Sequence, residues 1–423
     1  MKIALVNYRY FFSGGPERYL FNIKEILENN GHEVIPFSIK HKKNIPSDYE
    51  KYFLEPIGDG SEVYFGEYNK RSIKDSIKGF SRMLYSWEAK RKFKKFLQEV
   101  KPDIVYILYF QNKISCSIID AAYSLNIPIV QRISDYSLLC PCNIFYRYDI
   151  NSKCELCLQN SKWNAVKYKC VYNSSIYSFI KKLAIDIQNF VNIQDKINAF
   201  IFPSKFTLSK FVEGRFSEEK LFHVPTLFNT NSLRNDLEIQ YENFALYIGR
   251  TDPDKGIMTL LNTFIGTNYH LKIIGFSNGN YHDTLIEYTK GKKHNIEFLG
   301  KVEFDQMQEY LSKCLFTIIP SEWYDNLPNT LLESFAFKKC VVATNIGSLS
   351  ENIIDNETGL LFDYKSTESL FEKVDFLFKN QDIAIKMGQK ANESILGKFS
   401  IDKHYESLIS IFNTIEHVKK SNK

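Results

Sequence analysis

Short apolar runs alternate with segments of helical periodicity along the chain. We expect strands at the following runs, most of them followed by glycine or a polar turn: 1–8, 32–37, 104–108, 128–133, 199–203, 244–248, 271–274, 296–299, 314–319 and 340–343. Between the first two runs, Leu20, Ile23, Ile26 and Leu27 share one face of a predicted helix. Strands that alternate with helices predict an α/β fold with doubly wound parallel sheets. Ligands bind such sheets at the carboxyl ends of the strands.

The length of 423 residues predicts two domains, each with a core of its own. We place an N-terminal domain at 1–225, with 199–203 as its last strand. A polar, Asn-rich linker at 226–242 then leads to a second domain at 243–398. A terminal helix lies within 399–423.

Composition excludes some classes of protein. The net charge of +5 is too small to argue for a nucleic-acid partner. No apolar run approaches the ~20 residues that a membrane-spanning helix needs. The first residues are a strand and not a signal peptide, so we expect a cytoplasmic protein.

The segment 320–333 carries the strongest chemical signal. It follows a predicted buried strand and opens a helix, with Asn326 as candidate N-cap and Pro328 in the first turn. A strand, a polar loop and a helix N-terminus form an anion site, because free N–H groups and the helix dipole point at the loop. Asp325 and Glu333 could bind hydroxyl groups beside a bound phosphate. The alternative is a capped helix with one exposed glutamate.

A second strand-to-helix connection contains two cations. Gly249 and Arg250 follow the predicted strand 244–248, and Lys255 and Gly256 close the same loop. These cations could grip a diphosphate. A solvated loop with two surface cations is the alternative. Gly14 and Gly15, after the first strand, allow the backbone to approach a ligand closely, although most such pairs are simple turns.

Together these motifs resemble family 4 of the retaining glycosyltransferases (glycosyl transferases group 1), of the cell-surface polysaccharide type. Asp325-x7-Glu333 resembles the family's donor signature, with Asp where Glu is usual, and Gly249-Arg250-x4-Lys255-Gly256 resembles its diphosphate element. The segments 335–347 and 355–361 also fit. The resemblance implies the GT-B fold, with two Rossmann-like domains facing a cleft, and a terminal helix that crosses back to the first domain.

The resemblance also implies the roles of individual residues. Arg250 and Lys255 would stabilise charge on the leaving diphosphate, Asp325 would bind the donor sugar, and Glu333 would bind the ribose. The remaining substrate-binding positions would be Gly14, Gly15, Ser134, Gly249, Asn326, Leu327, Pro328 and Asn329. Retention of anomeric configuration and independence of an obligatory metal follow from the same resemblance. Asp252-Pro253-Asp254 matches a metal-binding Asp-x-Asp pattern, but we interpret it as a turn.

The chain departs from the family at Ser134. Many relatives have His-Asp at this point, and the histidine lines the catalytic cleft, whereas this chain has Ser134-Asp135 and no histidine between His41 and His223. Either Ser134 or a neighbour contacts the donor sugar, or activity is lost. We favour the first alternative, with Asp135 as a catalytic residue that orients the acceptor.

Five of the eight cysteines lie between 140 and 170. Cys154 and Cys157 have zinc-knuckle spacing, and Cys140, Cys142 or Cys170 could complete a structural zinc site. The alternative is a set of independent reduced thiols in a loop shaped for the acceptor.

The most basic stretch is 71–100. Ile73, Ile77, Phe80, Leu84 and Trp87 recur there at helical spacing among lysines and arginines. A basic amphipathic helix can lie on an anionic membrane. We favour the alternative, a helix that packs its apolar face on the sheet. The resemblance still allows peripheral contact with the inner face of the membrane, since many relatives use lipid-linked acceptors.

We therefore predict a hexosyltransferase-type enzyme that moves a sugar from a nucleotide donor, UDP- or GDP-linked, to a glycan or lipid-linked acceptor in bacterial surface polysaccharide biosynthesis. A non-catalytic sugar-nucleotide-binding protein of the same fold is the alternative. A Rossmann oxidoreductase fits poorly, because no Gly-x-Gly-x-x-Gly follows the first strand.

Overall fold

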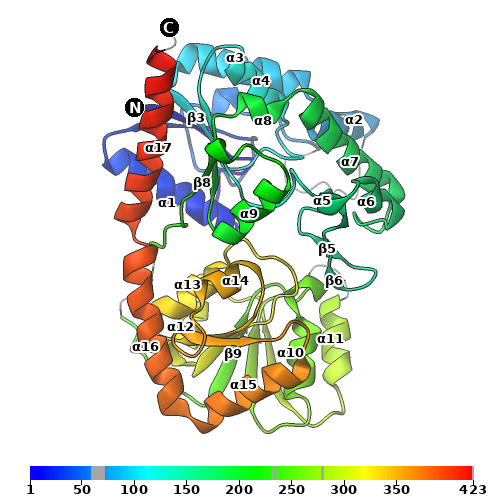
Figure 1. The fold of residues 1–423 in the computed structure, drawn as a ribbon, viewed down its shortest axis with the longest axis vertical. Coiled ribbons are helices and arrows are strands. Elements are labelled where there is room, and N and C mark those ends of the chain that lie inside the picture. The colour runs from blue at the N-terminus through cyan, green and yellow to red at the C-terminus, as the bar shows by residue number, and fades with distance from the viewer. Residues whose placement is uncertain (59–71, 231–232, 235, 278–280, 422–423) are drawn as a thin grey trace.

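The computed structural model describes residues 1–58, 72–230, 233–234, 236–277 and 281–421. It has two six-stranded sheets, each built from parallel strand pairs with helices on both faces (Figure 1). One sheet lies in each half of the chain, and the two halves are stacked along the long axis of the molecule. The predicted α/β architecture with two doubly wound sheets is confirmed.

The first sheet has the strand order β2-β1-β3-β4-β7-β8. Its strands are β1 (Lys2–Val6), β2 (Glu33–Phe37), β3 (Ile104–Ile107), β4 (Ile129–Arg132), β7 (Ala199–Phe202) and β8 (Leu221–His223). Our prediction that 199–203 forms the last strand of this half is wrong, because β8 adds an edge strand beside β7. A three-residue, half-buried strand carries too short an apolar run to be recognised.

The second sheet has the order β11-β10-β9-β12-β13-β14. Its strands are β9 (Phe244–Ile248), β10 (His270–Ile274), β11 (Asn295–Gly300), β12 (Phe316–Ile319), β13 (Cys340–Thr344) and β14 (Gly359–Phe362). β9, β12 and β13 are almost wholly buried, as expected for central strands covered on both faces.

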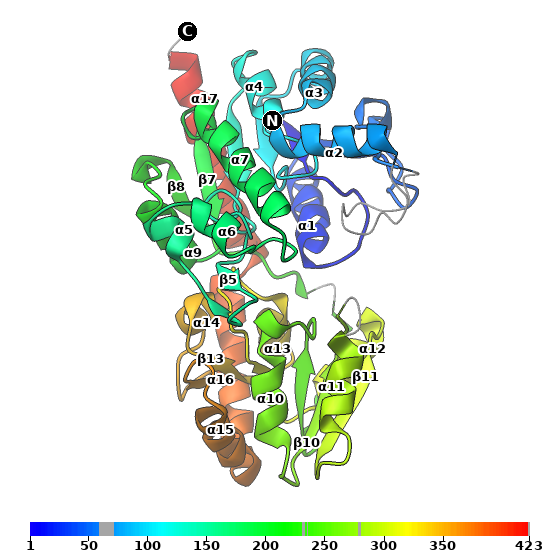
Figure 2. The same ribbon diagram turned by 90° about the vertical axis from the view of Figure 1, so that its right-hand side faces the viewer.

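Helices cover both sheets (Figures 1 and 2). Those of the first half are α1 (Gly15–Asn29), α2 (Ile73–Leu84), α3 (Trp87–Val100), α4 (Ser117–Tyr123), α5 (Leu156–Gln159), α6 (Trp163–Lys167), α7 (Ser175–Phe190), α8 (Ile193–Lys196) and α9 (Lys205–Glu213). Those that follow are α10 (Ile257–Phe264), α11 (Tyr281–Thr289), α12 (Phe304–Lys313), α13 (Asn329–Ala336), α14 (Gly347–Asn352), α15 (Thr367–Lys379), α16 (Gln381–Lys398) and α17 (Ile401–Ser421). Within the described ranges, no helix has the length and apolar character required to cross a membrane.

The last helix, α17, runs along the first half of the molecule (Figure 1). His404 fixes it there: one ring nitrogen lies 2.7 Å from the Pro225 carbonyl oxygen, and the other lies 2.9 Å from the Tyr19 hydroxyl of α1. The C-terminal end of the chain is thus tied to the N-terminal sheet. The domain boundaries at 225, 242 and 398 remain predictions.

The basic stretch forms two helices, α2 and α3, and its packing differs from the one we favoured. α2 buries Gly79, Arg82 and Met83, while Ile73 and Ile77 are exposed. Arg82 is held inside because its guanidinium donates to the Glu55 carbonyl oxygen (2.5 Å). Three of the five apolar residues that the pattern assigned to the sheet, Ile73, Ile77 and Trp87, are therefore exposed, while Phe80 and Leu84 are partly buried.

Candidate functional site

The predicted site residues gather where the carboxyl ends of both sheets face each other. Residues from both halves line one cavity of about 820 Å³, among them Asp135 after β4, and Arg250 and Trp323 after β9 and β12. The halves also touch beside it, where the rings of Phe206 and Tyr324 lie 4.8 Å apart. This junction is where ligands bind in open α/β sheets.

Lys255 lies at the end of a 3-10 turn, Pro253–Lys255, that follows β9. Its ammonium binds both carboxylate oxygens of Asp325, at 2.7 and 3.0 Å. The next residue, Gly256, has a φ of +69°, and an added Cβ would overlap the Pro320 carbonyl oxygen. Only glycine fits this position. The close contact between Gly256 and Pro320 therefore fixes the position of the backbone at Lys255.

Arg250 pairs with both carboxylates of the Asp-x-Asp segment. Its guanidinium contacts Asp252 and lies 2.9 Å from the fully buried Asp254. Asp254 also accepts a hydrogen bond from the Tyr148 hydroxyl (3.1 Å). The segment therefore forms the predicted turn and neutralises Arg250. More than half of the Arg250 side chain is exposed, so it can reorient toward a ligand.

The helix after β12 begins later than we predicted. α13 starts at Asn329, and Pro328 occupies the cap position without a side-chain cap, so the N-cap assigned to Asn326 is wrong. The Asn326 side chain instead accepts from the Thr207 hydroxyl (2.6 Å) and donates to the Ile133 carbonyl oxygen (2.9 Å). Asn326 thus links the two halves. Its neighbour Leu327 is partly buried against the apolar core of the second half.

Gly15 brings the first half against the start of α13. A Cβ on Gly15 would overlap the Asn329 side-chain amide. Gly14, just before it, has an extended backbone, which any residue can adopt. The close approach is therefore specific to Gly15, and it places the N-termini of α1 and α13 beside each other.

Glu333 is buried in α13, where its carboxylate forms an ion pair with Arg18 of α1. The guanidinium carbon of Arg18 also lies 4.3 Å from the centre of the Phe304 ring. Arg18 was not among the predicted site residues. The available signal was a cation in the first turn of the helix that begins at Gly15.

Ser134 and Asp135 follow β4, but only Asp135 lines the cavity. The Ser134 hydroxyl donates to the Leu108 carbonyl oxygen (3.3 Å) and accepts from Arg132 (3.3 Å). Asp135 accepts from the Tyr109 hydroxyl (3.0 Å) and from the Ser137 backbone N–H (2.9 Å). Burial raises the pKa of Asp135 above its usual range, and these hydrogen bonds partly oppose the shift.

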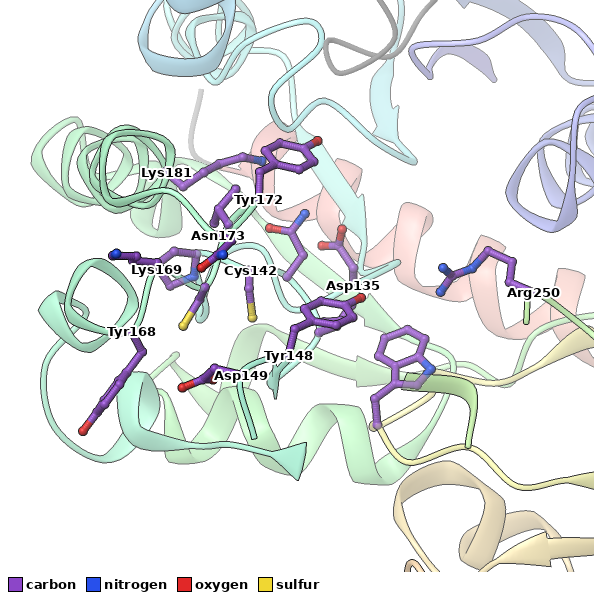
Figure 3. Close-up of a pocket in the computed structure, with 16 residues that line it drawn as sticks. Asp135, Cys142, Tyr148, Asp149, Tyr168, Lys169, Tyr172, Asn173, Lys181 and Arg250 are labelled. Atoms are coloured by element: carbon purple, nitrogen blue, oxygen red, sulfur yellow. The ribbon is translucent and has the colours of Figure 1, made fainter. Parts of the chain in front are cut away.

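The cavity extends from Arg250 past Asp135 to the cysteine-rich loop (Figure 3). Its wall combines aromatic rings with polar groups, and Tyr148, Tyr168, Tyr172, Asp149, Asn173 and Lys181 are among them. Burial lowers the pKa of Lys181 to about 8, while Asp135 opposes that shift. Tyr148 and Lys181 were not among the predicted site residues.

The cysteines between 140 and 170 are all free thiols. Within the part of the chain that the structure describes, no three His, Cys, Asp or Glu side chains are arranged to hold a metal ion, so the predicted zinc ligands do not fit. The sulfurs of Cys140 and Cys142 lie 3.3 Å apart, and Cys142 also lies 3.4 Å from the Tyr146 carbonyl oxygen. The Cys140 thiol interacts with the thiols of both Cys142 and Cys157, and Cys142 also bonds to the backbone.

A two-stranded hairpin in the same loop connects the halves. Its strands, β5 (Tyr146–Arg147) and β6 (Ser152–Lys153), are antiparallel. The backbone N–H of Lys153 donates to the Tyr364 hydroxyl (3.0 Å), and that hydroxyl lies 3.3 Å from the Glu322 carbonyl oxygen. The cysteine-rich loop therefore contacts both halves.

Comparison with known proteins identifies the family. Residues 229–394 match the profile of the family Glycosyl transferases group 1. The second half of the chain therefore carries the domain of this family of glycosyltransferases. An uncharacterized glycosyltransferase of Methanocaldococcus jannaschii is 28% identical over 200 residues, which cover 46% of this chain and 55% of that protein. An uncharacterized 42.6 kDa protein in the cps region of Klebsiella pneumoniae is 24% identical over 83% of this chain and 87% of that protein. The capsular polysaccharide biosynthesis glycosyltransferase CapM of Staphylococcus aureus is 25% identical over 43% of this chain and 50% of that protein.

Solved structures confirm the GT-B fold over nearly the whole chain. A sucrose-phosphate synthase from Thermosynechococcus elongatus superposes with a TM-score of 0.69 at 16% identity, covering 99% of each chain. Anabaena HepE, solved in complex with UDP-glucose, superposes with a TM-score of 0.63 at 14% identity, covering all of both chains. Among the relatives above, the match spans about half the length of two and most of the third.

Proposed function

We propose that this protein is a retaining glycosyltransferase that moves a sugar from a nucleotide diphosphate to a glycan or lipid-linked acceptor in surface polysaccharide biosynthesis. The observation that carries the proposal is the single cavity that Asp135 of one half and Arg250 of the other both line. The cps-region relative and CapM support the polysaccharide assignment. We place the reaction in the cytoplasm, at the inner face of the membrane.

The donor diphosphate would bind between Arg250, Lys255 and the N-terminus of α13. That helix end lacks a side-chain cap, so its N–H groups and dipole are directed at the junction. Negative charge grows on the leaving phosphate as the glycosidic bond breaks. Fixed positive charges at that point supply the largest catalytic contribution we expect.

Arg250 and Lys255 are already paired with carboxylates, and a diphosphate would have to compete with these carboxylates for the two cations. Arg250 is paired with Asp252 and Asp254, and Lys255 is paired with Asp325. A diphosphate must share the cations with them or displace them. Asp325 would then be free to accept from donor sugar hydroxyls, while Glu333 accepts from the ribose hydroxyls. UDP-glucose bound to HepE supports a uridine donor, with a guanosine donor as the second choice.

The acceptor would occupy the cavity that leads to the cysteine-rich loop. Sugar rings bind proteins through aromatic faces and polar groups at their edges, and this wall offers Tyr148, Tyr168, Tyr172 and Trp323 beside Asp135 and Asp149. Asp135 follows β4 at the junction of the two halves, so it would orient the attacking hydroxyl. Ser134 is turned into the protein and would act only through its neighbours.

The test is substitution of the donor cations. Arg250→Ala and Lys255→Ala should each weaken UDP and GDP binding in calorimetry and reduce turnover by about 30- to 1,000-fold, equivalent to about 2–4 kcal/mol. Arg234→Ala is the matched control, because Arg234 is also an arginine held by two carboxylates, Asp236 and Glu309. Unchanged binding and turnover in both site variants would refute the donor assignment.

Ser134 favours a second candidate, a sugar-nucleotide-binding protein without activity. A histidine that relatives use at this point is absent from the chain. Such a protein would bind UDP-glucose or GDP-sugars but release no free nucleoside diphosphate. Slow hydrolysis of the donor by the purified protein, abolished in Arg250→Ala, would exclude this candidate.

A further inference from the structure

Large apolar side chains on one side of the first half are exposed rather than buried. Among the described residues, the five most exposed large apolar side chains are 70–87% exposed. They are Ile73, Trp87, Tyr172, Ile176 and Phe190. α7 packs against both α2 and α6, and Figures 1 and 2 show these three helices on the same side of the molecule. We call the exposed side of α2, α6 and α7, with Trp87 at the start of α3, the α2–α7 face.

The two main helices of this face leave several large apolar side chains exposed. α7 buries Ser178, Ala184, Ile185 and Gln188, while Ile176, Phe179 and Phe190 are exposed. α2 buries Gly79, Arg82 and Met83 and exposes Ile73 and Ile77. A surface helix normally turns its large apolar side chains toward the core. Two adjacent helices that each leave large apolar side chains exposed mark an interaction site.

The same segments carry an excess of positive charge. Residues 72–95 contain eight Lys and Arg against two Asp and Glu, and residues 161–190 contain five against one. These segments therefore have a net charge of +10 in a chain whose total is +5. The ammonium of Lys182 lies 4.4 Å from the Trp163 ring, and that of Lys90 lies 5.2 Å from the Trp87 ring. Apolar side chains surrounded by lysines are typical of helices that lie on an anionic membrane.

The face adjoins the proposed acceptor cavity. Tyr172 belongs to both, because it is one of the exposed rings and also lines the cavity. Lys169 is exposed and also lines the cavity, and so does Lys181 of α7. A molecule anchored in a bilayer under the α2–α7 face would therefore meet the cavity at Tyr172.

We propose that the α2–α7 face docks on an anionic lipid bilayer and that the acceptor enters the cavity from that bilayer. The second part rests on the proposed function, whereas docking itself does not. The exposed apolar side chains would enter the headgroup region, and Lys74, Arg91 and Lys169 would contact anionic headgroups. The occupant is a membrane rather than another protein, because positive charge predominates in both segments.

The experiment is flotation of the full chain with vesicles. The protein should float with vesicles in which about a third of the lipid is phosphatidylglycerol, bind pure phosphatidylcholine at least about tenfold more weakly, and dissociate as salt rises. The triple variant Ile73→Ser, Ile176→Ser, Phe190→Ser should lose at least about tenfold in vesicle affinity. These side chains are exposed, so the fold should survive. Ile354→Ser, Phe371→Ser, Phe376→Ser replaces exposed apolar residues of the second half and should bind like the wild type.

A charge variant separates the electrostatic contribution to vesicle binding from the contribution of the apolar side chains. Lys74→Glu with Arg91→Glu should abolish the preference for anionic vesicles, while Lys290→Glu with Lys292→Glu in the second half should not. Equal binding to neutral and anionic vesicles would overturn the proposal. Unchanged flotation of the triple variant, or self-association of the wild type in place of vesicle binding, would also overturn it.

Donor binding, measured without vesicles, keeps this proposal distinct from the proposed function. The triple variant should show the wild-type thermal shift with UDP, because Ile73, Ile176 and Phe190 are absent from the donor site. A wild type that floats but binds neither UDP nor GDP would refute the transferase assignment and leave docking intact. A wild type that binds donor but never floats would refute docking alone.

Discussion

Arg18 of α1 and Glu333 of α13 form an ion pair between the two halves of the protein, 315 positions apart in the chain. The carboxylate that we assign to the ribose is thus already charged, buried and oriented before a donor arrives. A preorganised acceptor loses little freedom on binding, which favours donor affinity. Because of this ion pair, the Glu333 carboxylate would accept from the ribose hydroxyls while it is also bonded to Arg18.

Glu333→Gln should raise the donor KM and the Kd for UDP or GDP by about tenfold. A neutral amide accepts hydroxyl hydrogen bonds more weakly than a carboxylate, and a bond to a charged group is worth about 1.5 kcal/mol or more. Calorimetry with free nucleotide measures the change. Glu351→Gln is the control, because Glu351 also bridges the halves, through the N–H groups of Lys205 and Phe206. Equal affinities in wild type and Glu333→Gln would make Glu333 a purely structural partner of Arg18.

Asp135→Asn should reduce kcat by about 100-fold while the donor Kd stays the same. The carboxylate orients the acceptor only during transfer, so its loss affects the transition state more than the bound donor. Ser134→Ala should cost less than about threefold, since the Ser134 hydroxyl bonds to the Leu108 carbonyl oxygen. Steady-state kinetics with donor hydrolysis or transfer separates the two. If Asp135→Asn lowers only the melting temperature, Asp135 caps a turn and has no catalytic role.

The pH dependence of kcat should show the raised pKa of Asp135. Burial is the main cause, so its charged form is lost at a higher pH than in a free aspartate. Activity that needs the carboxylate therefore falls as pH decreases through this raised pKa, and the acidic limb lies above the ordinary value of 3.8. A limb that persists unchanged in Asp135→Asn would assign the titration to another group.

Transfer should continue in excess EDTA. Charge on the leaving diphosphate is neutralised by Arg250, Lys255 and the α13 dipole, so no divalent ion is required. Asp252 and Asp254 already serve as partners of Arg250. Complete loss of activity in EDTA, restored by magnesium or manganese, would instead make these aspartates metal ligands.

Stability should decrease as pH falls from about 6.5 to about 4 because of His404. Burial lowers the pKa of this ring from 6.5 to about 4, so the unfolded chain takes up a proton that the folded chain excludes. The stability that this difference contributes is fully present above pH 6.5 and declines below it, by about 3 kcal/mol at most.

His404→Gln isolates this effect from the other histidines. The variant loses stability at all pH values through the changed contacts with Tyr19 and Pro225. The difference between wild type and variant should nevertheless shrink as the pH is lowered. Thermal denaturation at several pH values measures it, and a constant difference would show that His404 does not titrate on unfolding.

The sheets and the donor loops were predictable because their signals are local. The run Phe244–Ile248 is a strand in both the prediction and the structure, and Gly256 stands where a left-handed residue is required. Local patterns of this kind depend on a few consecutive residues. The N-cap of α13 was missed by two positions, because Asn326 is a good N-cap by type but its side chain bonds to Thr207 and Ile133 instead.

Relationships between distant segments were not predictable from the sequence. The Arg18–Glu333 pair and the Tyr148–Asp254 hydrogen bond depend on how the halves meet. Only part of the α2–α7 face was predictable. The pattern of 71–100 predicts a basic amphipathic helix, but it does not reveal which side of that helix is buried. Arg82 decides this by reaching the Glu55 carbonyl oxygen, a partner 27 positions away.

The hydrogen bond from Tyr148 to Asp254 couples the donor and acceptor sites. Asp254 accepts from Tyr148, a wall of the acceptor cavity, and from Arg250, the donor cation. A diphosphate that binds Arg250 would draw it away from Asp254. Tyr148 would then be the remaining partner of this buried carboxylate, so the hydrogen bond between Tyr148 and Asp254 would become stronger and would hold Tyr148 in place in the cavity wall. Coupling between sites is reciprocal in free energy, so an acceptor that holds Tyr148 in place raises donor affinity by the same factor. Under the proposed function, this buried aspartate would couple the binding of the two substrates.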